Sequence, residues 1–132
     1  MAFTAGLKIV PGYPLQLADK FVIVFDRTGP TSYTQFVSST GLGGDILKAT
    51  GSGLNKGGFD YMDGDFLDTT GQVSVFPIVT LGGYGNAAPQ VTLVYYSLVT
   101  ATLGGVSQTA NTQIAAATNL STFSFRLRAF MV

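Results

Sequence analysis

The residues best suited to chemistry are the aspartates, which supply every carboxylate side chain of this 132-residue chain. Four of the seven fall within ten residues, FDYMDGDFLD, with no Lys or Arg among them: Asp60, Asp63, Asp65 and Asp68. Crowded carboxylates repel one another, and a hard cation such as Ca²⁺ relieves that repulsion. A calcium loop of the EF-hand kind ends on a bidentate Glu, however, and the chain contains no Glu. We therefore predict no metal site, and keep these four aspartates as the calcium candidates of a looser cluster.

A β-hairpin is the alternative explanation of the same stretch. Asp-Gly is a strong signal for a two-residue type I′ turn, and a turn at Asp63-Gly64 would place Tyr61 opposite Phe66. An aromatic pair across two strands stabilises a hairpin. This pairing spreads the acids over both faces of the hairpin, and it is the interpretation that we favour.

Catalytic chemistry has little support in the sequence. The chain contains no His, Cys or Glu, so a general base acting near neutral pH would be an Asp or Lys with a strongly shifted pKa. Residues 51–58, GSGLNKGG, lack the Gly-Lys-Ser/Thr ending of a phosphate loop. Residues 83–88, GYGNAA, precede Pro89 and a strand pattern, where a dinucleotide site has a helix. We predict that the protein is not an enzyme, has no catalytic residues and binds no cofactor.

Four other side chains are candidates for contacts with a protein partner: Tyr13, Tyr84, Arg126 and Arg128. Tyr13 belongs to VPGYP, a stiff and extended segment. Tyr84 stands in a glycine-rich loop, where it stacks on a sugar, contacts a protein or folds back onto the sheet edge. Arg126 and Arg128 share one face of the last predicted strand. There they pair with acids of a neighbouring subunit, or blunt an exposed strand edge.

Charge is scarce. Charged residues make up 11% of the chain and its net charge is zero, against roughly 25% charged residues in ordinary soluble domains. A nucleic-acid surface needs a basic excess, so we predict no nucleic-acid partner. The longest apolar run, FVIVF, is too short to span a bilayer, and we find no signal peptide, so we predict no membrane partner. So few charges favour a surface that is largely covered by other protein.

The elements that position these residues are predicted to be strands. We expect strands at Lys20–Asp26, Tyr33–Val37, Gln72–Leu81, Gln90–Leu103 and Ser121–Val132. The last alternates cleanly, with Phe123, Phe125, Leu127, Ala129 and Met131 on one face. Pro77 within its strand predicts an edge strand or a bulge. The stretch Gln108–Asn119 makes one or two helical turns or a loop.

Strands separated by Gly, Pro and Asp turns predict an all-β fold. We expect one domain, residues 1–132, built as an antiparallel β-sandwich of jelly-roll type or as a small barrel. Glycine-rich Gly41–Gly58 predicts either a long mobile loop or a strand-poor excursion folded against a neighbour. Residues 1–14 form an extended N-terminal arm, which adds a strand to a partner's sheet or pairs within its own domain.

The segment MAFTAGLKIVPGYP, the glycine-rich loop and the final FSFRLRAFMV together resemble small virion proteins of tailed bacteriophages, the head-decoration or cement proteins. The resemblance implies a non-enzymatic jelly-roll subunit, made in the host cytoplasm, that sits on the capsid surface. Its implied partners are other copies of itself, with a homotrimer favoured, and the larger protein lattice of the virion. Two alternatives stay open. One is a glycan- or receptor-binding module of a phage tail fibre, using Tyr84 and the Asp60–Asp68 carboxylates with Ca²⁺; the other is a self-polymerising extracellular fibre subunit.

Overall fold

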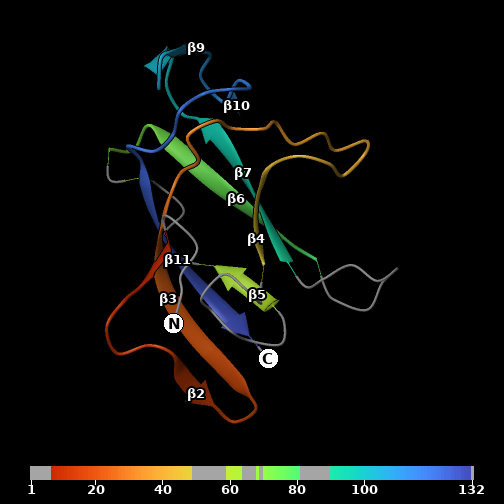
Figure 1. Cartoon of the computed structure of the whole chain (residues 1–132), viewed down its shortest axis with the longest axis vertical. Helices are drawn as coiled ribbons and strands as arrows, with labels where there is room; N and C mark the ends of the chain where they lie inside the picture. The colour runs from red at the N-terminus through yellow and green to blue at the C-terminus, as the bar shows by residue number, and fades with distance from the viewer. Residues whose placement is uncertain (1–6, 49–58, 64–67, 69, 81–89, 132) are drawn as a thin grey trace.

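The protein is all-β in the computed structural model, which describes residues 7–48, 59–63, 68, 70–80 and 90–131 (Figure 1). These residues contain no helix, and so no helix long and apolar enough to cross a membrane. The strands are β1 (Leu7–Ile9), β2 (Leu15–Leu17), β3 (Lys20–Thr28), β4 (Asp45–Lys48), β5 (Phe59–Asp63), β6 (Val73–Thr80), β7 (Gln90–Ser97), β8 (Ala101–Leu103), β9 (Val106–Gln108), β10 (Thr112–Gln113) and β11 (Ser124–Met131).

The first sheet has the order β1-β3-β11-β5, and β2 also pairs with β3. β11 runs along β3 over eight residues, from Ser124 opposite Thr28 to Met131 opposite Phe21. β1 and β2 pair with β3 as an interrupted edge strand. Ile9 of β1 lies opposite Phe25, and Leu15 of β2 lies opposite Val22. The chain therefore advances six residues along this edge while β3 advances only three, because the segment between β1 and β2 leaves the ladder. The part of the predicted N-terminal arm that the structure describes therefore pairs within its own chain, which was the second of the two expectations.

The second sheet is built around β7. β4 and β10 pair with β7, and β6 pairs with it over eight residues. Among the described residues β6 pairs with β7 alone. Pro77 therefore stands in an edge strand, where a missing N–H is tolerated, as its place in the sequence pattern predicts. A third, two-stranded sheet consists of β8 and β9.

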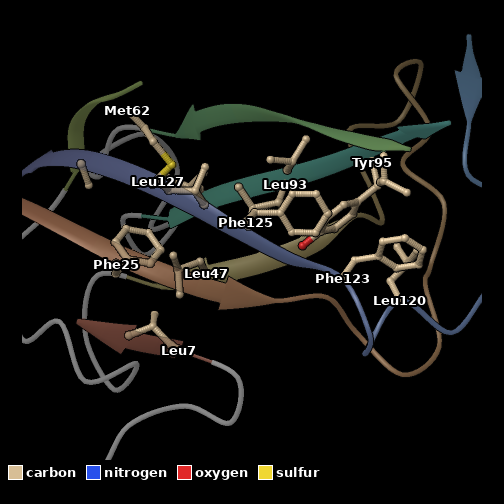
Figure 2. Packing of buried hydrophobic residues seen from close by; sticks show 14 of the residues in the cluster. Leu7, Phe25, Leu47, Met62, Leu93, Tyr95, Leu120, Phe123, Phe125 and Leu127 are labelled. Carbon is tan, nitrogen blue, oxygen red and sulfur yellow. The ribbon is translucent and has the colours of Figure 1, made fainter. Parts of the chain in front are cut away.

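The two larger sheets share one hydrophobic core (Figure 2). From the first sheet, Phe25, Phe125 and Leu127 are at most 1% exposed; from the second, Leu93 and Tyr95 are fully buried. The rings of Tyr95 and Phe125 lie 5.1 Å apart, so the sheets touch directly. The alternation predicted for the last strand is confirmed, because all five residues of its predicted inner face are buried: Phe123, Phe125, Leu127, Ala129 and Met131.

The chain changes sheet repeatedly. β3, β5 and β11 belong to the first sheet, while β4, β6 and β7 belong to the second. An early strand pairs with a late one in each: β3 with β11, and β4 with β7. The remaining two strands then join the same late partners, β5 with β11 and β6 with β7. All of these pairs are antiparallel.

The long loop predicted for Gly41–Gly58 is wrong in part, because β4 (Asp45–Lys48) lies within it and pairs with β7. Two of the predicted strands are also wrong. Tyr33–Val37 is irregular except for one bridge from Val37 to Leu42. The backbone of Tyr33 exchanges hydrogen bonds with Ala117 and Thr118 in place of a strand. Gln90–Leu103 is not one strand, since β7 ends at Ser97 and the chain then turns into the β8–β9 hairpin. The stretch Gln108–Asn119 is a loop that contains the short β10, which was the non-helical alternative.

The β8–β9 turn gives a test of how closely this hairpin packs. Gly104 and Gly105 both have positive φ, +55° and +83°, but a Cβ on Gly104 would overlap the carbonyl oxygen of Asn119, whereas one on Gly105 meets nothing within 4 Å. We expect Gly105→Ala to lower the free energy of unfolding by roughly 1 kcal/mol, and Gly104→Ala by a further ~1–3 kcal/mol through overpacking. Urea unfolding of both variants at one protein concentration measures the difference. Equal losses would contradict the close contact.

Candidate functional site

Arg27 on β3 and Asp45 on β4 form a buried ion pair between the two larger sheets. Nη2 of Arg27 donates to Oδ1 of Asp45 at 2.7 Å, and Nε donates to Oδ2 at 3.2 Å. The two side chains are 8% and 9% exposed. The hydroxyl of Tyr95, on β7, donates to the same Oδ2 at 2.7 Å. The carboxylate of Asp45 therefore accepts hydrogen bonds from residues of both sheets.

A second set of hydrogen bonds extends this polar cluster towards the surface. The Tyr33 hydroxyl donates to Oε1 of Gln113 at 2.8 Å and accepts from the backbone N–H of Tyr95 at 3.3 Å. Gln113 also accepts from the backbone N–H of Phe36 and donates to its carbonyl oxygen. The rings of Tyr33 and Tyr95 meet edge to face at 5.4 Å. The irregular segment after Tyr33 is thus fastened to β7 and β10 by side chains, which the sequence pattern alone did not predict.

The electrostatics of this cluster suit a structural role. Burial on its own would lower the pKa of Arg27, but the hydrogen bond and the charge of Asp45 outweigh it and raise that pKa above its usual value. Burial, and then the charge of Asp45, raises the pKa of Tyr95 well above its usual value. Burial raises the pKa of Tyr33 to about 12. At neutral pH the arginine is charged and both phenols are protonated, so none of the three is a ready general base.

The aspartate-rich stretch is only partly described. The side chain of Asp68 is buried, and its carboxylate accepts hydrogen bonds from the backbone N–H groups of Thr70 and Val73 and from the Thr70 hydroxyl. These bonds close the turn that leads into β6. The backbones of Asp60 and Asp63 belong to β5, while their side chains and all of Asp65 lie outside the described residues. Among the side chains that the structure describes, no three metal-ligating groups come together.

The hairpin predicted at Asp63-Gly64 lies partly outside the described residues, because Gly64 and Phe66 are not among them. Tyr61 lies opposite Phe130 and Asp63 opposite Arg128, and Asp68 bridges to Phe125. β5 and Asp68 therefore both contact β11, while the pairing of Tyr61 with Phe66 stays a prediction.

Arg126 is occupied within its own chain. Its Nε and Nη2 donate to the two carboxylate oxygens of Asp26, directly opposite on β3, at 2.8 and 3.0 Å. The hydrogen bond from Arg126 lowers the pKa of Asp26. Lys8 stands on the other side of Asp26, on β1, and its charge also lowers that pKa. The outer face of the first sheet thus carries charges that neutralise one another.

The surroundings of the other predicted contact residues, Arg128, Tyr13 and Tyr84, do not decide whether they contact a partner. The guanidinium of Arg128 lies 5.5 Å from the ring centroid of Phe130, on the same outer face. Tyr13 is partly buried in the segment between β1 and β2, and the Tyr13–Pro14 peptide bond is cis. Tyr84 lies outside the described residues. Whether these three contact another protein stays a prediction.

The outer face of the second sheet is apolar, a feature that was not predicted from the sequence. We name as the apolar face the outward side chains Ile46 on β4, Phe76 and Ile78 on β6, and Tyr96 and Leu98 at the end of β7. Phe76 is 58% exposed, Ile46 46%, Leu98 37% and Tyr96 36%. Val94, opposite Phe76 in the ladder, is only 1% exposed, so these larger side chains already form a closed layer over the strands. An exposed layer of this kind usually marks a contact with another molecule.

The pattern VSVFPIVT contained a signal for this face. Val73 and Val75 alternate inward, and a half-solvated antiparallel strand would place polar residues between them. Ser74 fits this expectation, but Phe76 and Ile78 occupy the next two outward positions. An apolar residue on both faces of a strand indicates that both faces are covered, but the sequence did not reveal which apolar set lies inside the chain.

Comparisons of the chain with protein-family models, with curated proteins and with solved structures returned no match.

The ion pair makes a prediction about two aspartates in different surroundings. We expect Asp45→Asn to lower the free energy of unfolding by roughly 3–5 kcal/mol, because it leaves the charge of Arg27 buried without a partner. Asp26→Asn removes the same charge from an exposed pair, where solvent screens the attraction, so the loss should be much smaller. Urea unfolding of both variants at pH 7 gives the comparison. Similar losses for the two variants would show that the buried pair does not hold the sheets together.

The buried phenols predict a loss of stability in alkali. A tyrosine in the unfolded chain ionises near pH 10, whereas burial raises the pKa of Tyr33 to about 12 and that of Tyr95 well above its usual value. The folded-state pKa values are raised, so their contribution is complete below about pH 10 and is lost as the pH rises through the folded pKa values. We expect a spectrophotometric titration of the six tyrosines to show two that ionise only above pH 11 or on unfolding. Six equivalent tyrosines would contradict the burial of this pair.

Proposed function

We propose that the chain is a non-enzymatic structural subunit that associates with copies of itself and binds a larger protein lattice, as capsid decoration or cement proteins of tailed bacteriophages do. The apolar face is the observation that carries this proposal. A protein with 11% charged residues and zero net charge has little to keep it apart from other proteins. An exposed Phe, Ile and Tyr on one sheet face is what a subunit needs for a lasting contact.

The strand order supports a jelly-roll-like β-sandwich as the architecture of this subunit. In such a fold the chain passes back and forth between two sheets, and early strands pair with late ones. The pairs β3–β11 and β4–β7 have this relation, and β5 and β6 join the same late strands. Jelly rolls are frequent among viral capsid proteins, which agrees with a place on the capsid surface.

The polar groups that the structure describes favour structure over catalysis. Within the described residues, each buried side-chain nitrogen and oxygen has a hydrogen-bond partner. The cluster around Arg27 joins the sheets, and Asp68 closes a turn. A calcium-dependent glycan site in the Asp60–Asp68 stretch would need the carboxylate of Asp68, which already accepts three hydrogen bonds. Because the Asp68 carboxylate already closes a turn, we regard the glycan-binding alternative as the weaker one.

The solution mass tests the proposal. Light scattering behind size exclusion should give a whole-number multiple of 13.8 kDa, both with added calcium and with EDTA. Association through apolar faces does not depend on a metal, so the mass should be the same in the two buffers. A mass of one chain at every concentration, or an oligomer that forms only with calcium, would overturn the proposed function.

A further inference from the structure

We infer that the apolar face is covered by the apolar face of a second copy of this chain, the two copies being related by a twofold axis that passes near Phe76. This inference rests on the proposed function, since it names the surface through which the subunit associates. The four most exposed members of the apolar face come from β4, β6 and the end of β7 in one sheet: Ile46, Phe76, Tyr96 and Leu98. A sheet face of this kind packs naturally against another sheet face at about 10 Å.

A neighbouring loop enlarges the face. Phe36 is fastened to Gln113, which pairs with Tyr96 in the ladder, and Gly44 donates to the carbonyl of Thr34 just before β4 begins. Between these two anchors the chain carries Val37 and Leu42, which bridge to each other and are 48% and 69% exposed. The backbone N–H groups of Thr40 and Gly41 both donate to Val37. The loop is therefore held in shape before any partner binds, which lowers the entropy lost on association.

The exposed area is sufficient for a stable pair. At roughly 200 Å² for a fully exposed large apolar side chain, the six exposed fractions of Ile46, Phe76, Tyr96, Leu98, Val37 and Leu42 amount to roughly 600 Å². That lies at the upper end of the largest apolar patch on a typical monomer, about 300–600 Å². Two such faces together bury roughly 1,200 Å² before any polar neighbour is added, which clears the ~1,000 Å² expected of a specific interface.

Charge also favours a second copy as the occupant. The chain has zero net charge, so two copies approach without net repulsion. Among the outward positions of the second sheet that the structure describes, one carries a charged side chain, Lys48. Lys48 lies opposite Gln90, at one end of β7. An axis that crosses the strands near Phe76 places the two Lys48 side chains at opposite ends of the interface. The other sheet's outer face is unlike this one, because Asp26 and Arg126 already neutralise each other there.

A charge-exchange experiment tests both the surface and the symmetry. Phe76→Glu and Phe76→Lys each place two like charges together at the axis, and each should raise the dissociation constant of the pair by roughly 30-fold or more. An equal mixture of the two variants should restore the wild-type mass, because Glu then meets Lys across the axis. Leu15→Glu is the matched control: Leu15 is 48% exposed on the first sheet, and its variant should associate as the wild type does. Circular dichroism and the unfolding midpoint establish that each variant is folded.

A second measurement does not depend on a disruptive charge. The chain contains no Cys, so Phe76→Cys introduces its only thiol, and mild oxidation should link two copies through residue 76. Leu15→Cys should give little linked product under the same conditions. A wild-type dimer supports the inference when both Phe76 tests succeed.

Three outcomes would overturn the twofold contact. The first is an oligomer that survives Phe76→Glu unchanged, and the second is a mixture of the charged variants that stays dissociated. The third is a wild-type trimer, which leaves the proposed function standing while removing the twofold axis. A wild-type monomer removes both.

Discussion

The bidentate contact between Arg27 and Asp45 is the interaction on which the relation of the two sheets depends. Taking two charges out of water is expensive, and only good geometry with further hydrogen bonds compensates for it. Asp45 meets that condition, since it accepts from two nitrogens of Arg27 and from the Tyr95 hydroxyl. Apolar side chains would tolerate a small slide of one sheet over the other. A bidentate pair does not, so it fixes where β3 lies against β4.

The rest of the interior follows from that arrangement. Tyr95 is held at its hydroxyl by Asp45 and packs its ring against Phe125 of the first sheet and Tyr33 of the irregular segment. Tyr33 in turn reaches Gln113, which secures Phe36 and the loop beyond it. One connected set of polar groups therefore runs from the centre of the molecule to the edge of the apolar face. Buried hydrogen bonds therefore help to hold the loop beside the apolar face in place.

Strands with simple alternation could be predicted from the sequence, and contacts between distant residues could not. Composition predicts the strand Lys20–Asp26, and alternation predicts the inner face of Phe123–Met131; the structure confirms both. Tyr33–Val37 has the composition of a strand, but the hydroxyl of Tyr33 finds a partner 80 residues away, and the backbone follows it. Asp63-Gly64 has the chemistry of a turn, but Asp63 pairs with Arg128 of β11, and Asp68 bridges to Phe125 of the same strand.

The apolar face was not predicted from the sequence. The scarcity of charge favoured a surface covered by protein, but the residues predicted to contact a partner were Tyr13, Tyr84, Arg126 and Arg128. Arg126 is engaged by Asp26 from the facing strand, a partner 100 residues away in the chain. Phe76 was not among them, because its strand carries apolar residues on both faces. Only the fold separates the valines that fill the core from the Phe and Ile that face outward.

The two outer faces of the molecule differ. On the first sheet Asp26 and Arg126 neutralise each other and Leu15 and Leu17 of β2 are exposed, whereas on the second sheet we propose that the apolar face meets a partner. A dilution series followed by amide chemical shifts tests this division most directly, since a 13.8 kDa chain is accessible to solution NMR. The account predicts that shifts around Ile46, Phe76 and Tyr96 change with protein concentration, while those around Lys8, Asp26 and Arg126 stay constant. Changes centred on the first sheet, or none across the whole range from dissociated to concentrated protein, would contradict it.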